Sequence, residues 1–364
     1  MGHKHAQSEN FLLAKSSTSL CLHDYAPLQR LTRLSHLLLG LTKFACLSQI
    51  AYSLLPSLLS GSVFGADQPV TLSLLDITPA LGALAGVVME LEDLAMPLYA
   101  GAVASDNPDV AFADCDVIVF LGAFPRKEGM ERKDVMAKNV GIFNGQGAAL
   151  AKAKPGVKCL VVGNPANTNA LILSRAAGGV PAENITALTR LDHNRARMAL
   201  ALKSACPVET VDGVIIWGNH SSTQYPDVRH AKIGGKPAMD VITDAAWLEG
   251  DYISTIQKRG AAVIAARKLS SAASAAKAIS DHLRDWIGGS GGKVVSMGVF
   301  SDGSHYGIPA GIVYSFPVTC SAGKWTIVDG LAIDDFSRGK MDATAAELVE
   351  EQEMASSLLS GQAA

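Results

Sequence analysis

The chain has 364 residues, of which 48% are hydrophobic, and it carries a formal net charge of −3. A chain of this length and composition can bury a large core and is long enough for two domains or one large one. The small net charge and the scattered basic residues exclude a chain-wide attraction to nucleic acid or acidic lipid. We therefore expect a small-molecule partner, with no nucleic acid and no membrane.

Cysteine usage indicates a reducing compartment. The six cysteines form neither C-x-x-C pairs nor the spacing of a metal site, and Cys115 and Cys159 lie in or beside apolar, strand-like runs. This usage is typical of reduced core thiols. We predict no metal site.

Residues 1–44 differ in character from the rest of the chain. They contain five Lys or Arg and four His against two acidic residues, and they show no clear periodicity. This composition fits a transit peptide, and it equally fits a disordered or misassigned leader. Residues 44–66 carry no charge, but Ser, Gln and Pro interrupt them too often for a transmembrane helix.

Past residue 69, short apolar runs alternate with helical stretches. The runs are VTLSLLDI (70–77), CDVIVFLGA (115–123) and KCLVVGNP (158–165), and helical spacing is clear in 81–95 and 131–153. Such runs are typical of parallel strands that crossover helices bury on both faces. The pattern predicts an α/β fold with an open, Rossmann-like parallel sheet and ligands at the carboxyl ends of its strands.

After residue 205 the pattern changes. Runs of β-branched residues bounded by Gly, Asp and Ser, such as VDGVIIWGNHSS and GGKVVSMGVFSDG, flank a long Ala-rich stretch at 245–278. These runs indicate antiparallel strands beside helices, as in an α+β domain.

Asp76 closes the first clear strand. An acidic side chain in this position could accept hydrogen bonds from both ribose hydroxyls of an adenine dinucleotide, and it would repel a 2'-phosphate. Asp76 therefore favours NAD over NADP, although a turn residue would look the same.

The next two strands are also followed by polar groups. PRKEGMER places Arg126 and Arg132 on a Gly-containing loop before a helix, where two guanidinium groups could close over a bound dicarboxylate or form a solvated basic loop. Asn164 precedes Pro165, which holds the backbone extended and directs the amide into the crevice.

A candidate proton acceptor, His220, follows an apolar strand in IIWGNHSSTQYPD. An imidazole that exchanges a proton with a substrate hydroxyl needs a carboxylate behind it, and Asp192 in TRLDHNRARMALALK is the candidate. Arg195 lies on roughly the same helix face as Asp192 and could grip a carboxylate with two hydrogen bonds. Helix capping by Asp192, a solvent-facing Arg195 and a structural His220 are the alternatives.

Together these motifs resemble a known family. MERKDVMAKN, VVGNPANTNA, LTRLDHNRA and IIWGNHSSTQYPD closely resemble malate dehydrogenases of the cytosolic, NAD-dependent type, within the lactate/malate dehydrogenase superfamily. The resemblance begins at about Gln49 and continues through LLDITP and GVVMELEDLA to GIVYSFPVTC and beyond. It implies reversible oxidation of (S)-malate to oxaloacetate, NAD as cofactor, and a homodimer whose subunits meet at the GVVMELEDLA helix.

The resemblance also implies residue roles. His220 is the expected proton acceptor and Asp192 its partner. The expected substrate ligands are Arg126, Arg132, Asn164 and Arg195. The residues expected at the cofactor are Gln49, Ile50, Asp76, Asn139 and Gln146.

Lactate dehydrogenases share the fold and the His, Asp and Arg set. At position 126, however, the lactate enzymes resemble a Gln-bearing pattern, whereas this chain has Arg126. A cation that faces a methyl group is left unpaired, whereas a second carboxylate pairs with it. The sequence therefore favours malate and oxaloacetate.

The N-terminus is atypical for the family, which opens with a strand and the loop GAAGQIAYS. Here the loop reads ACLSQIAYS, with Ala45 and Ser48 at the glycine positions, and LSHLLLGLTKF stands where a Val/Ile-rich strand is expected. Side chains there would intrude on the pyrophosphate. Either the leader is mistranslated and the true first strand is missing, or the cofactor site is damaged and the protein is a non-catalytic, dimeric binding partner.

We therefore predict a non-matching leader (1–44), a dinucleotide-binding domain (45–188) and a catalytic, substrate-binding domain (189–364). The cytoplasm is the expected location. An organelle is the alternative if the leader is a transit peptide.

Overall fold

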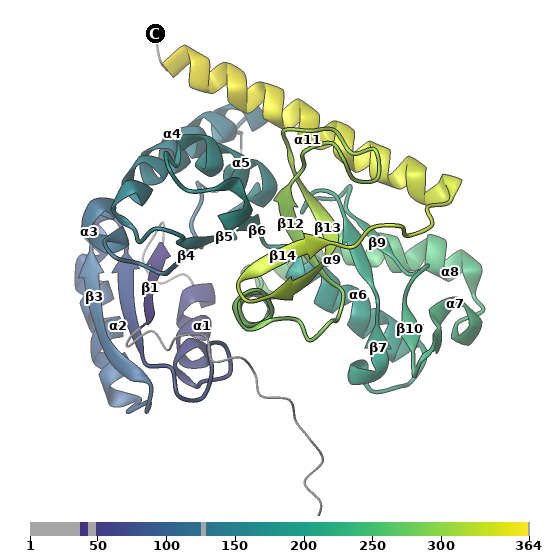
Figure 1. Cartoon of the computed structure of the whole chain (residues 1–364), viewed down its shortest axis with the longest axis horizontal. Helices are drawn as coiled ribbons and strands as arrows, with labels where there is room; N and C mark the ends of the chain where they lie inside the picture. The colour runs from purple at the N-terminus through teal and green to yellow at the C-terminus, as the bar shows by residue number, and fades with distance from the viewer. Residues whose placement is uncertain (1–36, 43–48, 125–128, 363–364) are drawn as a thin grey trace, which may run out of the picture. The chain divides into compact units, whose positions relative to one another are not determined.

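The computed structural model describes residues 37–42, 49–124 and 129–362, and every structural statement below concerns these residues. A nine-stranded sheet runs through them in the order β14-β13-β12-β6-β5-β4-β1-β2-β3 (Figure 1). The six parallel strands are β1 (Leu37–Thr42), β2 (Val70–Leu75), β3 (Tyr99–Ser105), β4 (Val117–Phe120), β5 (Lys158–Val161) and β6 (Ile185–Ala187). The antiparallel strands are β12 (Val295–Phe300), β13 (Val313–Ser321) and β14 (Lys324–Ile327).

The first strand is present, so the expectation that the chain lacks it is wrong. β1 lies between β2 and β4, with Leu39 in register with Leu72 on one side and Val117 on the other. It falls inside the segment 1–44, which was expected to be a non-matching leader. A strand covered on both faces needs apolar side chains more than it needs β-branching, so the leucine-rich LLLGLT satisfies it.

Gly40 lets β1 fit closely against its surroundings. A Cβ added at this position would lie 3.2 Å from the Cys115 sulfur and 3.2 Å from Cγ1 of Ile118. The chain thus supplies a central strand immediately before the expected phosphate loop. Ala45 and Ser48, the departures from the glycine pattern, lie outside the described residues.

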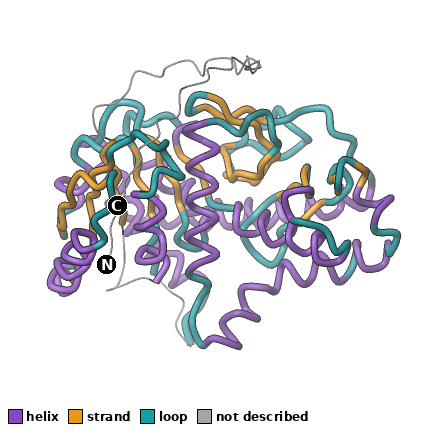
Figure 2. Tube along the Cα trace, turned by 90° about the horizontal axis from the view of Figure 1, so that it is seen from below, coloured by secondary structure: helices purple, strands orange, loops and turns teal. Residues whose placement is uncertain are grey.

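Helices cover both faces of the parallel strands (Figure 2). One buried cluster joins the sheet to α1 (Gln49–Leu59), α2 (Leu81–Asp93) and α10 (Ala273–Leu283). The other joins it to α3 (Pro108–Phe112), α4 (Arg132–Ala149), α5 (Ala166–Ala176) and α11 (Asp335–Gln362). The predicted doubly covered sheet is therefore confirmed.

The second half of the chain builds the predicted mixture of helices and antiparallel strands. Its remaining elements are α6 (Arg190–Lys203), β7 (Val211–Asp212), β8 (Ile215–Trp217), β9 (Tyr225–Asp227), β10 (Lys232–Ile233), β11 (Lys236–Pro237), α7 (Ala238–Val241), α8 (Ala245–Glu249) and α9 (Asp251–Arg267). Short 3-10 turns occur at Thr78–Ala80, Leu150–Lys152, Ala182–Asn184 and Val208–Thr210, and a π turn at Arg284–Gly288. β12 joins β6 in the main sheet through the pair Gly298 and Ala187, so the antiparallel strands extend the parallel ones.

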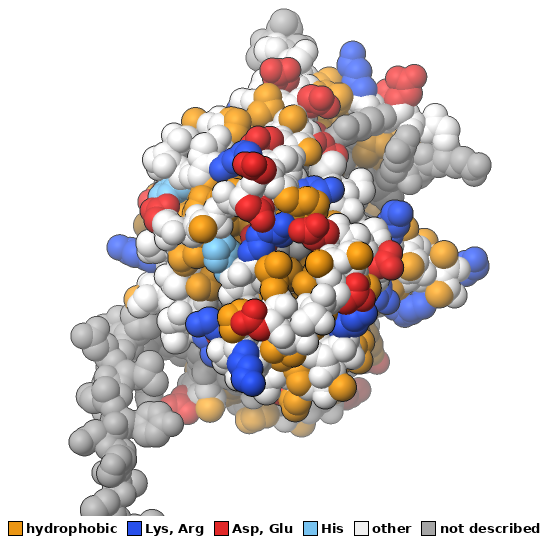
Figure 3. All heavy atoms as spheres, turned by 90° about the vertical axis from the view of Figure 1, so that its right-hand side faces the viewer, with side chains coloured by type: hydrophobic (Ala, Val, Ile, Leu, Met, Phe, Trp, Pro, Cys, Tyr) orange, Lys and Arg blue, Asp and Glu red, His pale blue; other side chains and the backbone are white. Residues whose placement is uncertain are grey.

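The surface and the thiols agree with the composition. Acidic and basic side chains are interspersed on the face shown in Figure 3. Cys115, Cys159, Cys206 and Cys320 are all free, and burial raises the pKa of Cys115 to about 12. None of the described helices combines the length and the apolar character that crossing a membrane requires.

Candidate active site

A cavity of about 630 Å³ opens beyond the carboxyl ends of β4, β5 and β6. Its walls include Phe124 after β4, Asn164 after β5 and Leu191 after β6, together with Ile50 of α1. Carboxyl ends of parallel strands are where open α/β sheets bind ligands. The opposite wall comes from the loop after β8, from α9 and from the connection between α9 and α10.

His220, Asp192 and Arg195 meet in this cavity. The Nδ1 atom of His220 is hydrogen-bonded to one carboxylate oxygen of Asp192, and Arg195 Nη1 donates to the other oxygen at 3.3 Å. Asp192 is fully buried, whereas the side chains of His220 and Arg195 are 19% and 15% exposed. Since Nδ1 is engaged, Nε2 is the ring nitrogen that a ligand can reach.

The carboxylate and the imidazole shift one another's pKa. Burial by itself lowers the pKa of His220, but the charge of Asp192 and its hydrogen bond outweigh burial and raise that pKa above its ordinary value. Burial by itself raises the pKa of Asp192, but His220 and Arg195 outweigh burial and lower it. The pair therefore stabilises a protonated imidazole beside an ionised carboxylate, the state that a proton acceptor reaches after it has taken its proton.

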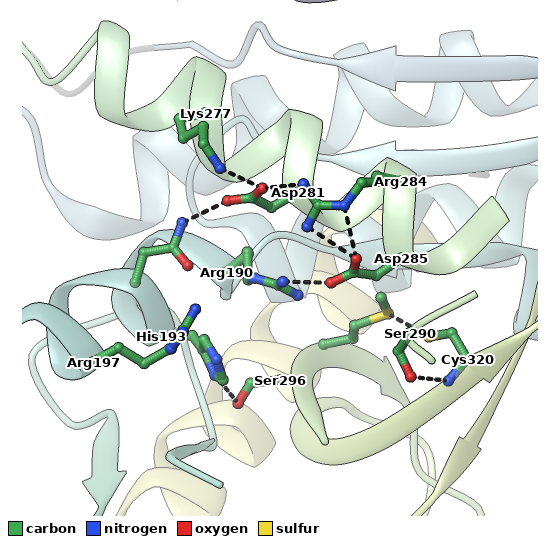
Figure 4. Close-up of polar contacts among 12 residues, drawn as sticks. Arg190, His193, Arg197, Lys277, Asp281, Arg284, Asp285, Ser290, Ser296 and Cys320 are labelled. Atoms are coloured by element: carbon green, nitrogen blue, oxygen red, sulfur yellow. Dashed lines mark hydrogen bonds and ion pairs between the residues drawn. The ribbon is translucent and has the colours of Figure 1, made fainter. Parts of the chain in front are cut away.

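The other face of α6 is held by a charged network (Figure 4). Arg190, 4% exposed, is hydrogen-bonded to Asp285 of the π turn, and Asn194 Nδ2 donates to Asp281 of α10 at 3.1 Å. Lys277 Nζ lies 2.5 Å from the Asp281 carboxylate. The contacts of Asn194 and Arg190 join α6 to α10 and to the π turn, and so help to hold the three residues of α6 that line the cavity.

The backbone of His220 is held by α5. Its N–H donates to Asn167 Oδ1 at 3.0 Å, and Asn167 Nδ2 donates to the carbonyl oxygens of Gly218 and Val313 at 3.2 and 2.9 Å. The sequence interpretation considered only Asn164 in the motif GNPANTNA and missed Asn167. The available signal was the second Asn of that motif, three residues after Asn164; in the structure this residue is fully buried in the first turn of α5.

Of the three remaining residues expected to bind substrate, only Asn164 has a described side chain. Asn164 is exposed at the cavity wall. Arg126 lies outside the described residues, and Arg132 begins α4 but its side chain is not described. Their expected roles stay predictions.

The expected cofactor residues are spread along the first half of the sheet. Asp76, 3% exposed, comes directly after β2 and accepts a hydrogen bond from the N–H of Ile77 at 2.8 Å. Asn139, fully buried, instead accepts a hydrogen bond from the N–H of Phe124 at 2.7 Å. Gln146 is buried, and its Oε1 has no hydrogen-bond partner within the described structure.

Two of the expected cofactor residues belong to α1. Gln49 is exposed at the first position of the helix, and Ile50 contributes to the cavity. The N-terminus of α1 therefore borders the cavity. A helix N-terminus favours negatively charged groups.

Sequence reasoning also missed Ser271, whose hydroxyl accepts a hydrogen bond from Arg195 Nη2 at 3.3 Å. It lies where the Ala-rich stretch breaks between α9 and α10. Lys268, with a φ of 59°, ends α9 in the left-handed region. The sequence KLSS at this break was the available signal, because Ser is favoured at helix boundaries.

Across the described ranges, no three His, Cys, Asp or Glu side chains are grouped so that they could hold a metal ion.

Comparisons with known proteins find family models that match most of the chain. The model of the lactate/malate dehydrogenase NAD binding domain matches residues 47–186, and that of the lactate/malate dehydrogenase alpha/beta C-terminal domain matches residues 189–358. Over 318 residues the chain is 59% identical to the cytoplasmic malate dehydrogenase of Rattus norvegicus, with 86% of this chain and 95% of that relative covered.

Two solved structures have the same fold along nearly their whole length. The malate dehydrogenase of Naegleria fowleri has a TM-score of 0.84 and 45% identity, covering 88% of this chain and 98% of that one. The lactate dehydrogenase of Trichomonas vaginalis in complex with NADH and oxamate has a TM-score of 0.84 and 37% identity, covering 89% and 99%. By sequence and by structure, the chain belongs to the lactate/malate dehydrogenase family.

Proposed function

We propose that the chain is an NAD-dependent malate dehydrogenase of the cytoplasm, which reversibly oxidises (S)-malate to oxaloacetate. Its support is a relative of 59% identity that is named a cytoplasmic malate dehydrogenase. The observation that carries the proposal is the His220, Asp192 and Arg195 cluster in a cavity at the carboxyl ends of the sheet strands.

In this reaction His220 is the proton acceptor. Nε2 takes the proton of the malate C2 hydroxyl while the C2 hydrogen leaves as hydride, and a carbonyl forms at C2. Asp192 holds the imidazole by Nδ1 and stabilises its protonated form. Arg195 grips the carboxylate next to C2 with parallel hydrogen bonds.

The cofactor site fits NAD where it is described. When bound, NAD supplies the nicotinamide ring that accepts the hydride. The buried carboxylate of Asp76 suits ribose hydroxyls and opposes a 2'-phosphate. Gln49, Ile50, Asn139 and Gln146 are the further residues that we assign to this side of the cavity.

Arg126, Arg132 and Asn164 complete the substrate site. We assign the two arginines to the distal carboxylate and to the carbonyl oxygen, and Asn164 to a further hydrogen bond with the substrate. This assignment separates malate from lactate, since only a dicarboxylate offers Arg126 an anion to pair with.

A homodimer is the expected assembly. Tyr52 of α1 and Met89 and Leu94 of the α2 region are 46%, 63% and 47% exposed, although they are large and apolar. Tyr52 and Leu94 border a groove of about 290 Å³ between the two helices. A second copy that covers this face would remove these side chains from water.

The alternative is a non-catalytic, dimeric binding protein with a damaged cofactor site. Two departures from the family pattern favoured it: an apparent lack of the first strand, and Ala45 and Ser48 at the glycine positions. The strand is present as β1, so only the two substitutions remain as an argument for this alternative. NADH fluorescence titration of the folded protein, followed by assays with malate and NAD, distinguishes the two. Saturable NADH binding with turnover supports the enzyme, whereas no binding at high micromolar NADH supports the alternative. Sequencing the mature N-terminus of the native protein tests whether residues 1–48 are authentic.

A further inference from the structure

A carboxylate of the C-terminal helix is bound by the loop that carries His220. One oxygen of Glu347, on α11, accepts three side-chain hydrogen bonds: from Asn219 Nδ2 at 2.9 Å, Ser221 Oγ at 2.5 Å and Thr223 Oγ1 at 2.6 Å. Two of these three donors are the immediate neighbours of His220 in the chain. Hydrogen bonds to a charged acceptor are stronger than those between neutral groups.

Thr344, one turn earlier on α11, reinforces this contact. Its hydroxyl oxygen accepts a hydrogen bond from the N–H of Asn219 at 2.9 Å, and its own O–H donates to Thr223 Oγ1 at 2.9 Å, since the Thr223 proton is directed at Glu347. Gly218 permits this close approach: its φ is +91°, and a Cβ there would lie 2.0 Å from the Thr344 methyl group. The loop is therefore shaped to receive α11.

The contacts fix His220 from both sides. α11 holds the residues before and after it, while Asn167 of α5 accepts the hydrogen bond of its own N–H. The imidazole then reaches Asp192 on α6. Among the described charged groups, Asp192 and Arg195 shift the pKa of His220, so α11 acts on the imidazole through the loop backbone.

We propose that Glu347 is a positioning residue, which holds the loop 219–223 so that the His220 imidazole meets Asp192 in the geometry for proton transfer. The proposal rests on the proposed function. It assigns to α11, which contributes no residue to the cavity wall described above, a direct part in the rate of the chemical step.

The test compares Glu347→Ala, Glu347→Gln and the control Glu350→Ala in the full chain. Glu350 is an exposed acid of the same helix. A displacement of about 1 Å in a catalytic group can cost about 100-fold in rate, so we expect E347A to lower kcat for malate about 10- to 100-fold. KM for malate should change less than kcat, because Arg195 and Asn164 are untouched. E347Q, which keeps an acceptor oxygen, should recover most of kcat.

The pH profile separates positioning from simple loss of stability. A weaker contact between His220 and Asp192 lets the His220 pKa fall, so the acidic limb of kcat/KM for malate should move to lower pH in E347A and stay in place in E350A. Wild-type kinetics in E347A, or a lower Tm with unchanged kcat and pH limb, would overturn the proposal. Absence of malate turnover in the wild-type protein would instead refute the proposed function.

A second variant covers the case in which E347A does not fold. Thr223→Val removes one donor to Glu347 and keeps the side-chain volume. We expect a smaller loss of kcat, and the combination with E347Q should lose less than the product of the two separate losses, because both changes break the same contact. If the loss of kcat in the double variant equals the product of the two separate losses, Thr223 and Glu347 do not act through the same contact.

Discussion

The side chain of Asn139 is hydrogen-bonded to both backbone polar groups of Phe124: Oδ1 accepts from the N–H at 2.7 Å, and Nδ2 lies 3.4 Å from the carbonyl oxygen. Phe124 lines the cavity at the end of β4. Asn139 was expected to contact the nucleotide, and in this structure it fixes the backbone at the cavity wall. A residue can serve both purposes if the wall it fixes is the one the cofactor touches.

Replacing Asn139 by Ala should therefore weaken the fold. The half-buried N–H of Phe124 loses its acceptor, which costs about 0.5–1.5 kcal/mol in the free energy of unfolding. Urea unfolding measures this loss. Asn144→Ala, an exposed amide on the same helix, is the control and should change stability by less than about 0.5 kcal/mol. Equal stability of the two variants would contradict the anchoring role.

The pH dependence should have opposite signs in the two directions. Malate oxidation needs neutral His220, so its kcat/KM should fall as the pH drops through the raised pKa of His220. Oxaloacetate reduction needs the protonated ring and should fall as the pH rises through it. Asp192→Asn removes the negative charge that raises the pKa of His220. The pH at which each of the two activities falls should therefore decrease, and kcat should drop about 100- to 10,000-fold. If both pH profiles of Asp192→Asn coincide with those of the wild-type protein, the contact between Asp192 and His220 does not set the pKa that the profiles report.

Arg126→Gln tests substrate choice. We expect it to lower kcat/KM for oxaloacetate about 10- to 100-fold and that for pyruvate far less, because only oxaloacetate brings a second carboxylate. Parallel assays of the two substrates with NADH measure the ratio. Equal losses on both substrates would count against a role of Arg126 in binding the distal carboxylate.

Gly40→Val tests the packing of β1. The added branches must enter space already bordered by Cys115 and Ile118, so overpacking should destabilise the fold by about 1–3 kcal/mol. Thermal and urea unfolding check this. Gly141→Ala is the control, because nothing lies within 4 Å of a Cβ at that helical position. It should leave stability unchanged or raise it by up to about 1 kcal/mol.

The sequence predicted most of what short-range patterns encode. The apolar runs at 70–77 and 158–165 became β2 and β5, and His220, Asp192 and Arg195 came together as proposed. Each of these predictions depends on a period of apolar residues or on the chemistry of a few side chains.

Other features depend on distant parts of the chain. β1 was missed because a leucine-rich segment with a glycine has low strand propensity by itself, and burial between β2 and β4 decides its conformation. Glu347 was missed because it lies 128 residues from Asn219, and no local pattern joins a C-terminal helix to a loop. Tertiary contacts of this kind are absent from any window of the sequence.

The pairing of β6 with β12 has a mechanical consequence. Gly298 and Ala187 are in register, and a Cβ at Gly298 would lie only 2.8 Å from that of Ala187. The two strands are therefore packed too closely for any side chain larger than glycine at position 298. Moving β12–β14 away from the parallel strands would therefore break this contact in the middle of the nine-stranded sheet. We therefore expect the sheet to move as one unit when a ligand binds, so that any closure of the cavity takes place in the loops around it.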